Sequence, residues 1–209
     1  MPVIGITGGI STGKTTFVRY LETLLPEARF FDADKEARRL TDEDDEIRAR
    51  IRNAFGRDIY SEAGDLNRAR LRAIILESAA NRVALEQILH PRIRSQWSAE
   101  AQTYRNSSDF FFADIPLLYE TGGEKLCDRV VVLACSPAVQ LQRLLARKSS
   151  GRAALTEHEA MDMINAQMPL EEKIKRADHV AWNNDGEMLL REQANDLVNF
   201  WRTKSWTAK

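Results

Sequence analysis

A glycine-rich stretch near the N-terminus constrains this chain more than any other part of its sequence. Residues 8–15 read Gly-Gly-Ile-Ser-Thr-Gly-Lys-Thr and match the spacing of two glycines, a lysine and a hydroxyl in a phosphate-binding loop. A β-rich run, Val3–Thr7, precedes the loop, and a helix-favouring run, Thr16–Leu25, follows it. A chance match to the pattern alone is expected in roughly one chain in a hundred. The flanking runs favour a genuine strand–loop–helix unit that binds nucleotide phosphates.

Each residue type in this loop has a physical reason to be there. Glycines let the backbone turn with its amides pointing inward, and the following helix N-terminus adds partial positive charge. Lys14 is expected to contact the β and γ phosphates, and the Thr15 hydroxyl is suited to coordinate Mg²⁺. The candidate nucleotide-binding residues in this stretch are Gly8, Gly9, Ser11, Thr12, Gly13, Lys14, Thr15 and Thr16.

Short β-rich runs recur along the chain and alternate with long stretches rich in Ala, Leu, Glu and Arg. This alternation predicts an α/β fold, a three-layer sandwich around a parallel five-stranded sheet. Nearly uninterrupted apolar runs suit strands covered by helices on both faces. The expected strands are Val3–Thr7, Arg29–Phe31, Phe110–Ala113, Arg129–Ala134 and His179–Trp182.

Two stretches interrupt the expected core. Residues 37–106 contain helical periodicity at Asn67–Ser78 and Arg82–Tyr104 but no convincing strand, which predicts a helical insertion. Residues 149–175 begin with Ser-Ser-Gly, and Thr156 with Glu159 forms a capping box before a helix through Gln167, which suits a lid. The nucleotide-binding core is then expected to comprise residues 1–36, 107–148 and 176–209.

Aspartates follow two of the expected strands. Asp32 and Asp34 follow the second strand, at the edge where open α/β sheets bind ligands. Asp32 suits a helix N-cap, whereas Asp34 is favoured to orient an attacking hydroxyl, with helix capping as its alternative. Asp114 ends the third strand and fits a carboxylate that helps to hold Mg²⁺, with a turn aspartate as its alternative. The acidic run 42–46 is interpreted as the start of a helix.

Arginine pairs and scattered histidines are harder to interpret. Arg68 and Arg72 share a helix face, as do Arg143 and Arg147. Solvated surface and anion binding are equally compatible with this spacing. No Cys/His spacing supports zinc, and His90-Pro91 is interpreted as packing at a helical break.

Composition and charge exclude several classes of protein. A net charge of −1, from 30 basic and 31 acidic residues, gives no global field for nucleic acid. The apolar runs are far shorter than the roughly 20 residues that span a bilayer, and the start of the chain does not resemble a signal peptide. Cys127 and Cys135 do not make a disulfide framework, so a cytoplasmic protein is expected.

Together with further segments, these residues resemble the dephospho-coenzyme A kinase family. The loop alone would indicate only a nucleotide, but its combination with the other segments is far more specific. The similar segments span nearly the whole chain: Gly8-Gly9-Ile10 with Gly13-Lys14, Asp32-Ala33-Asp34 with Ala37-Arg38, Phe55-Gly56, Leu66-Asn67-Arg68 with Leu71-Arg72, His90-Pro91, Asp114 with Pro116-Leu117-Leu118 and Glu120, Gln140 with Arg143-Leu144 and Arg147, Ala166-Gln167, and Ala177-Asp178.

The resemblance implies a nucleoside-monophosphate-kinase-like core, an acceptor-binding helical insertion and a lid. It implies that ATP, with Mg²⁺ held by Thr15 and Asp114, phosphorylates the ribose 3′-hydroxyl of dephospho-coenzyme A to give coenzyme A and ADP. The implied catalytic residues are Asp34 as base, Lys14 and Arg147. Further implied contacts are Arg143 and Asn183 for the nucleotide, and Asp34, Arg68, Arg72, His90 and Leu117 for the acceptor.

The chain departs from the family pattern in three places. Ser11-Thr12 stands where Gly-Ser is usual, Thr15 replaces a usual serine, and the stretch 148–154 is longer than expected. The first two changes keep the chemistry, and the third bears on the alignment of the lid.

Two rival hypotheses remain open at this point. The chain could be another kinase of this loop class, acting on a nucleotide or a small alcohol, or a nucleotide-gated switch whose helical insertion binds a partner. The main hypothesis expects only the small molecules ATP and dephospho-coenzyme A as partners, with no nucleic acid, no membrane and no obligate protein partner.

Overall fold

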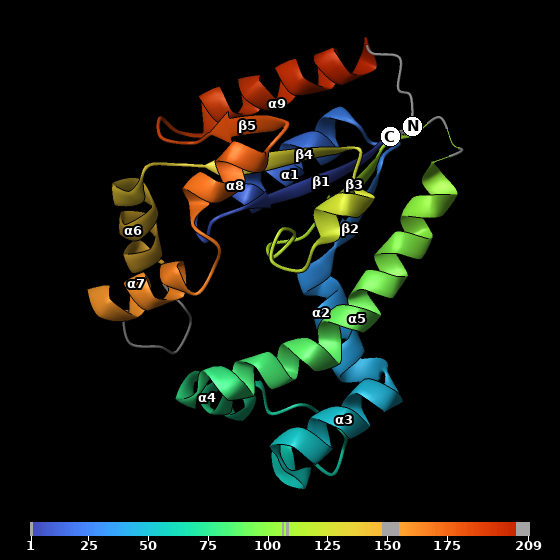
Figure 1. Cartoon of the computed structure of the whole chain (residues 1–209), viewed down its shortest axis with the longest axis vertical. Helices are drawn as coiled ribbons and strands as arrows, with labels where there is room; N and C mark the ends of the chain where they lie inside the picture. The colour runs from blue at the N-terminus through green and yellow to red at the C-terminus, as the bar shows by residue number, and fades with distance from the viewer. Residues whose placement is uncertain (1, 106, 108, 148–154, 204–209) are drawn as a thin grey trace. The chain divides into compact units, whose positions relative to one another are not determined.

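The computed structural model describes residues 2–105, 107, 109–147 and 155–203 and has an α/β fold around one sheet (Figure 1). The strand order is β2-β3-β1-β4-β5, and the registers of β1 with β3 and β4, and of β4 with β5, are all parallel. The expected α/β sandwich with a parallel five-stranded sheet is therefore confirmed. The strands are β1 (Val3–Gly8), β2 (Arg29–Asp32), β3 (Phe111–Asp114), β4 (Arg129–Ala134) and β5 (His179–Trp182).

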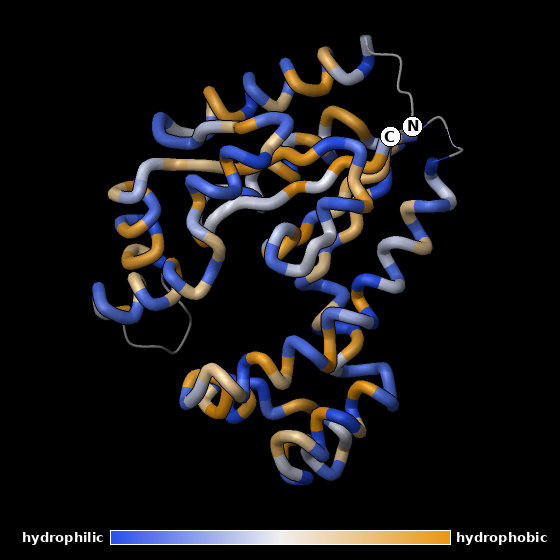
Figure 2. The backbone as a smooth tube through the Cα atoms, in the orientation of Figure 1, coloured by the Kyte–Doolittle hydropathy of each residue, from blue (hydrophilic) through white to orange (hydrophobic). Residues whose placement is uncertain are grey.

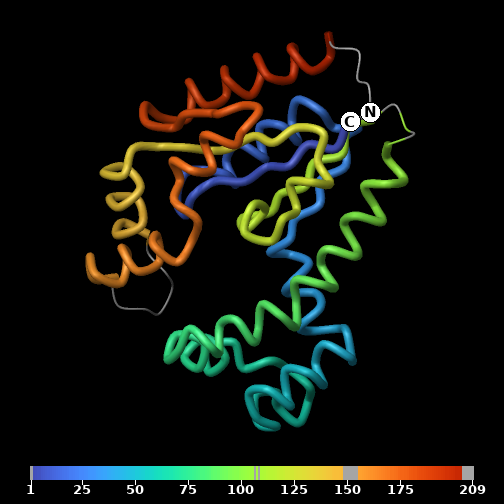
Figure 3. Tube along the Cα trace, in the orientation of Figure 1, coloured from blue at the N-terminus to red at the C-terminus, as the bar shows by residue number. Residues whose placement is uncertain are grey.

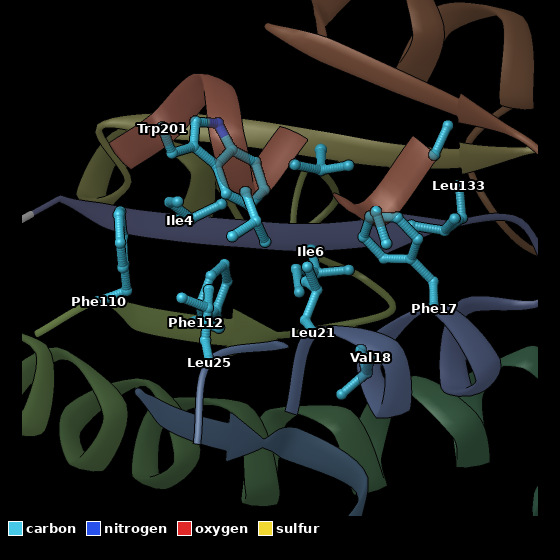
Figure 4. Close-up of a cluster of buried hydrophobic side chains, with 14 of the residues drawn as sticks. Ile4, Ile6, Phe17, Val18, Leu21, Leu25, Phe110, Phe112, Leu133 and Trp201 are labelled. Atoms are coloured by element: carbon cyan, nitrogen blue, oxygen red, sulfur yellow. The ribbon is translucent and has the colours of Figure 1, made fainter. Parts of the chain in front are cut away.

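One face of the sheet is covered by α1 (Lys14–Leu24) and α9 (Glu187–Arg202), which lie far apart in the sequence (Figure 3). α9 alternates between hydrophobic and hydrophilic residues in Figure 2, so that one side of the helix can be buried. Ile4 and Ile6 of β1 meet Phe17 of α1 and Trp201 of α9 in a shared core (Figure 4). Each such buried side chain contributes about 1.5–3 kcal/mol through burial.

The opposite face of the sheet is covered by the chain between β3 and β4 and by α8 (Leu170–Arg176). A Cβ atom at Gly5 of β1 would lie 2.6 Å from Leu118 and 2.9 Å from the Cys127 sulfur, so this strand and its covering segment approach closely. Both faces of β1 are therefore buried, as its continuous apolar pattern requires.

The chain folds into two compact units, Met1–Phe31 with Ala101–Lys209, and Asp32–Glu100. The second unit is helical, and its described strand-like pairing is a single bridge between Tyr60 and Leu66. Its elements are α2 (Ala33–Glu43), α3 (Asp45–Phe55), the 3₁₀ turn η1 (Arg57–Ile59), α4 (Arg68–Glu77) and most of α5 (Ala79–Tyr104).

The expected helical break at His90-Pro91 was wrong, because α5 continues through both residues. Proline has no N–H, so the carbonyl of Gln87, four residues earlier, loses its usual helical donor. The guanidinium of Arg50 in α3 donates to that carbonyl at 3.5 Å. A side chain from a neighbouring helix thus partly replaces the missing backbone bond.

The remaining helices of the first unit are α6 (Pro137–Ala146), α7 (Glu157–Asn165) and the 3₁₀ turn η2 (Gly123–Leu126). The predicted capping box of Thr156 and Glu159 is present, although α7 ends at Asn165 rather than Gln167. The predicted Ser-Ser-Gly entry to the lid lies outside the described residues. Among the described residues, no helix is both long enough and apolar enough to cross a bilayer.

Candidate active site

The phosphate-binding loop connects the end of β1 to the first residue of α1. Gly13 has φ +97° and precedes α1 without a side-chain cap, and Ser11 has φ +60°. The amides of the first turn of α1 therefore donate no hydrogen bond to a capping side chain. An 11-residue helix with an uncapped N-terminus is suited to bind an anion through these amides.

Three glycines of the loop lie where neighbouring groups leave no room for a side chain. A Cβ atom would lie 2.6 Å from the Leu133 carbonyl oxygen at Gly8, and 2.6 Å from the Gln140 amide nitrogen at Gly9. At Gly13 it would lie 2.1 Å from the amide nitrogen of Asn183. The loop is thus held against its neighbours at three points, which supports a preset phosphate cradle.

Lys14 and Asp114, predicted to bind phosphate and Mg²⁺ respectively, form an ion pair. Asp114 ends β3 opposite Ile6 of β1, so its carboxylate emerges at the edge from which the loop departs. The side chains of Lys14 and Asp114 are only 15% and 8% exposed. Thr15 is exposed and Thr16 is half-buried beside them in sequence.

Asn183 and Arg143, both expected to serve the nucleotide site, bind each other and the loop. The buried Asn183 amide donates to the Thr12 carbonyl at 2.9 Å. Arg143 donates to the Asn183 backbone carbonyl at 2.8 Å and to its side-chain oxygen at 3.3 Å. Burial raises the pKa of the neighbouring Cys135 thiol, and Arg143 partly opposes this shift. Arg143 therefore acts on the loop through Asn183.

Arg147 was paired with Arg143 by its spacing, but the structure gives it different surroundings. It follows the last residue of α6 and is exposed. Its side chain makes no hydrogen bond or ion pair within the described ranges, which stop at this residue and resume at 155. Its catalytic role stays a prediction.

Three residues to which the sequence analysis gave no role also contact the loop or its base. The buried Gln140 amide donates to the Ile10 carbonyl at 2.8 Å, and the Ile10 amide donates to Gln167 at 2.9 Å. Lys173 is fully buried and donates to the Gly8 carbonyl at 3.3 Å. Gln140 and Gln167 both belong to segments that resemble the kinase family, and this resemblance is the signal in the sequence that could have identified them. Lys173 lies in a run of charged residues that looks like ordinary helix surface.

In the helical unit, the structure confirms the expected N-cap role of Asp32 and gives Asp34 different surroundings. Asp32 is the N-cap of α2, since its carboxylate accepts from the amides of Asp34 at 2.9 Å and Lys35 at 3.0 Å. Asp34 lies in the first turn of α2, and its exposed carboxylate accepts no hydrogen bond from the described residues of this unit. Its role toward an acceptor hydroxyl stays a prediction.

The candidate acceptor residues are divided between the units. Arg68 pairs with Asp42 at 2.7 Å on the surface, and Arg72 is half-buried one turn along α4. His90 is half-buried in α5, where burial lowers its pKa and Glu86 opposes the shift. Leu117 belongs to the first unit, where it is half-buried just after β3. Their shared role in binding the acceptor stays a prediction.

The chemistry of the described side chains narrows the possible reactions. Burial raises the pKa of Cys127 to about 12, so this thiol is not a ready nucleophile. Within the described ranges, no three His, Cys, Asp or Glu residues form a metal-binding group. The oxygen donors Asp114 and Thr15 are few, which fits Mg²⁺, a cation that keeps waters and takes substrate phosphates as ligands.

In comparisons with known proteins, a family model and two similar curated sequences carry the same name. A model of the dephospho-CoA kinase family matches residues 2–189. The chain is 37% identical over 202 residues to a dephospho-CoA kinase from Bacillus cereus, covering 95% of this chain and 96% of that one. It is 34% identical over 210 residues to a dephospho-CoA kinase from Carboxydothermus hydrogenoformans, covering 100% and 98%.

Solved structures share the fold. TT1252 from Thermus thermophilus superposes with a TM-score of 0.76 at 28% identity, covering 97% of this chain and 98% of that one. A dephospho-CoA kinase from Campylobacter jejuni gives a TM-score of 0.69 at 24% identity, covering 94% and 95%. A shikimate kinase from Aquifex aeolicus gives 0.52 at 13% identity, covering 97% and 99%, which reflects the fold alone.

Proposed function

The chain belongs to the dephospho-CoA kinase family, and we propose that it transfers the γ-phosphoryl group of ATP to the ribose 3′-hydroxyl of dephospho-CoA, giving CoA and ADP. The observation that carries this proposal is the pairing of Lys14 with Asp114 beside an uncapped helix N-terminus. A cation for phosphate and an anion for Mg²⁺ are thereby brought together where the phosphates of a nucleotide would bind.

The loop binds the phosphates of ATP through its backbone amides and the positive end of α1. Lys14 exchanges its contact with Asp114 for the β and γ phosphate oxygens, and Asp114 and the Thr15 hydroxyl would hold Mg²⁺. Mg²⁺ held by these two residues would supply positive charge that neutralises the phosphates. Arg143 and Asn183 keep the Thr12 carbonyl in place, so the loop needs little rearrangement to receive the phosphates.

The acceptor binds to the helical insertion and presents its 3′-hydroxyl to Asp34. The exposed Asp34 carboxylate orients this hydroxyl and takes its proton late in the transfer. Arg68 can leave Asp42 for an anionic group of the acceptor at little cost, because an exposed ion pair contributes only about 0–1 kcal/mol. Arg72, His90 and Leu117 complete the acceptor contacts in this proposal.

In this proposal, three parts of the chain have different roles. Residues 1–36, 107–148 and 176–209 form the nucleotide-binding core, residues 37–106 bind the acceptor, and residues 149–175 form a lid. Arg147, unlike Arg143, has no contact that holds it back from the transferring phosphoryl group among the described residues. The proposal places the enzyme in the cytoplasm, acting on small molecules without nucleic acid, membrane or an obligate protein partner.

A coupled assay of ADP release tests the proposal against its rivals. Wild-type protein with ATP and Mg²⁺ is mixed with dephospho-CoA, shikimate, AMP or no acceptor, and Lys14→Ala serves as the loop control. We expect rapid ADP release with dephospho-CoA alone among these acceptors, and none from Lys14→Ala. Release with another acceptor would indicate a different kinase, and slow release that ignores every acceptor would favour a nucleotide-gated switch.

A further inference from the structure

Lys173 of α8 is a fully buried lysine with three acceptors around its ammonium group. Its Nζ atom lies 3.3 Å from the Gly8 carbonyl oxygen, 3.1 Å from the Pro116 carbonyl oxygen and 2.8 Å from the Glu120 carboxylate. An ammonium has three N–H donors, so all of them are satisfied. The side chain of Lys173 is 0% exposed, whereas Lys175, two residues later, is 68% exposed and pairs with Glu172.

The carbonyls that Lys173 holds belong to the two segments of the proposed phosphate site. Gly8 is the first residue of the phosphate-binding loop and lies six residues before Lys14. Pro116 lies two residues after Asp114, and its carbonyl also accepts from the Thr7 hydroxyl at 2.9 Å. Lys173 therefore joins the base of the loop to the chain that leaves β3.

The residues just before Lys173 reinforce this connection. The Gln167 side chain accepts from the Ile10 amide at 2.9 Å, and the Met168 amide donates to Glu120 at 2.9 Å. Residues 167–173 thus contact the loop at Gly8 and Ile10, and they contact the segment after β3 at Pro116 and Glu120. This stretch is the exit of the proposed lid.

We propose that Lys173 is a positioning residue for phosphate binding, which holds the Gly8 and Pro116 carbonyls so that the loop and Asp114 keep the spacing that ATP with Mg²⁺ requires. The inference rests on the proposed nucleotide site, but not on the identity of the acceptor. Burying a charged amine is costly unless it is paired and fully hydrogen-bonded. An apolar residue could anchor α8 without that cost, so the polar contacts, rather than packing alone, account for a lysine here.

Two substitutions separate positioning from stability. Lys173→Met keeps an unbranched side chain one atom shorter and removes all three contacts, leaving Glu120 without its cation. Lys173→Met combined with Glu120→Gln also removes that unpaired charge, and an uncompensated charge is the main cost of removing one partner of an ion pair away from water. Lys175→Met is the matched control, because it removes an exposed lysine and its ion pair from the same helix.

The direct readout is the ATP dissociation constant, measured by calorimetry with Mg²⁺ and without any acceptor. Both Lys173→Met proteins are expected to bind ATP about tenfold or more weakly, as for other partners that orient binding groups. The KM for dephospho-CoA should stay within about twofold, and Lys175→Met should match wild type. The double variant should regain much of the melting temperature that the single variant loses, without regaining ATP affinity.

Two further variants separate the effect of Lys173 from that of Glu120 and provide a replacement if a variant does not fold. Glu120→Gln retains an oxygen acceptor and both carbonyl contacts, so its ATP affinity should stay within about threefold of wild type. If neither variant that carries Lys173→Met folds, Lys173→Gln replaces them. The ATP affinity of Lys173→Gln should be about three- to tenfold lower than that of wild type, because an amide has too few N–H donors for all three acceptors.

Wild-type ATP affinity in a folded Lys173 variant would overturn the inference. ATP affinity that recovers together with the melting temperature in the double variant would also overturn it, since Lys173 would then be structural only. If wild-type protein binds no ATP, the proposed function fails and the inference fails with it. If it binds ATP but does not phosphorylate dephospho-CoA, only the acceptor assignment fails.

Discussion

Lys14 at the start of α1 forms an ion pair with Asp114 at the end of β3. In the proposed function, these two residues bind groups of opposite charge, the phosphates of ATP and Mg²⁺. Each residue is the other's partner before it serves the substrate, so the pairing keeps two largely buried charges compensated. Binding of ATP with Mg²⁺ would then replace this ion pair by a contact of Lys14 with phosphate and a contact of Asp114 with Mg²⁺.

Replacing Asp114 by asparagine should raise the Mg²⁺ concentration needed for half-maximal activity by about tenfold or more. Asparagine keeps the size of the side chain but removes the charge that attracts the cation. The measurement is initial rate against free Mg²⁺ at saturating ATP. Asp196→Asn, an exposed change on α9, is the control and should follow the wild-type curve. An unchanged Mg²⁺ dependence in Asp114→Asn would exclude Asp114 as a ligand.

Gly13→Ala should weaken ATP binding by about tenfold or more. A side chain at φ +97° carries roughly 1–3 kcal/mol of backbone strain, and its Cβ atom would lie 2.1 Å from the Asn183 amide nitrogen. Displacing Asn183 would release the Thr12 carbonyl that it holds. Calorimetric titration with ATP and a thermal melt measure the two effects.

The control for this prediction is Gly186→Ala. Gly186 also has a positive φ, +103°, but an added Cβ atom there meets nothing within 4 Å. It should therefore lower the melting temperature through strain while ATP affinity stays close to wild type. Equal ATP affinities in the two variants would show that the contact with Asn183 does not control the loop.

Asp34→Asn should lower kcat by about 10²-fold or more, since the general base contributes on the order of 10²–10⁴ in rate. ATP affinity should change by no more than about threefold, because the substitution removes a charge proposed to act on the acceptor. Steady-state kinetics and ATP titration on the same protein give both values.

Asp32→Asn is the matched control, because asparagine is about as good an N-cap as aspartate. Its two hydrogen bonds to the start of α2 can be kept by the asparagine oxygen, so activity should stay within about twofold. A larger loss of kcat in Asp32→Asn than in Asp34→Asn, with ATP binding intact, would mean that Asp32 is the functional carboxylate.

The proposed lid should become more protected from hydrogen exchange when ATP and dephospho-CoA bind together. The slowing should concentrate in α7, whereas α8 should change less, because Lys173 already holds α8 against the loop base. Mass spectrometry of peptides from residues 155–176 measures this, with peptides from α9 as the reference. Unchanged exchange in α7 would count against a lid.

The sheet and the loop could be predicted from sequence because their signals are local. Each strand is a short apolar run bounded by turn residues, and the loop pattern lies between a strand and a helix that can be recognised on their own. The N-cap role of Asp32 and the capping box at Thr156 are equally local, and both are present.

Features that depend on distant residues could not be predicted in this way. The break expected at Pro91 is absent, where Arg50 from another helix donates to the carbonyl left without a helical donor. The run that contains Lys173 looks like solvated surface until α8 is placed beside Gly8 and Pro116. Arg143 and Arg147 share a spacing, yet Arg143 is bound to Asn183 and Arg147 is exposed.

The position of the new phosphate in the product distinguishes phosphorylation of the ribose 3′-hydroxyl from every other reaction of this protein with ATP. Wild-type protein is incubated with ATP, Mg²⁺ and dephospho-CoA, and the product is analysed by phosphorus and proton magnetic resonance. We expect one added phosphoryl group on the ribose 3′-oxygen, formed in equal amount to ADP and absent with Lys14→Ala. A product phosphorylated elsewhere, or ADP formed without a phosphorylated acceptor, would contradict it.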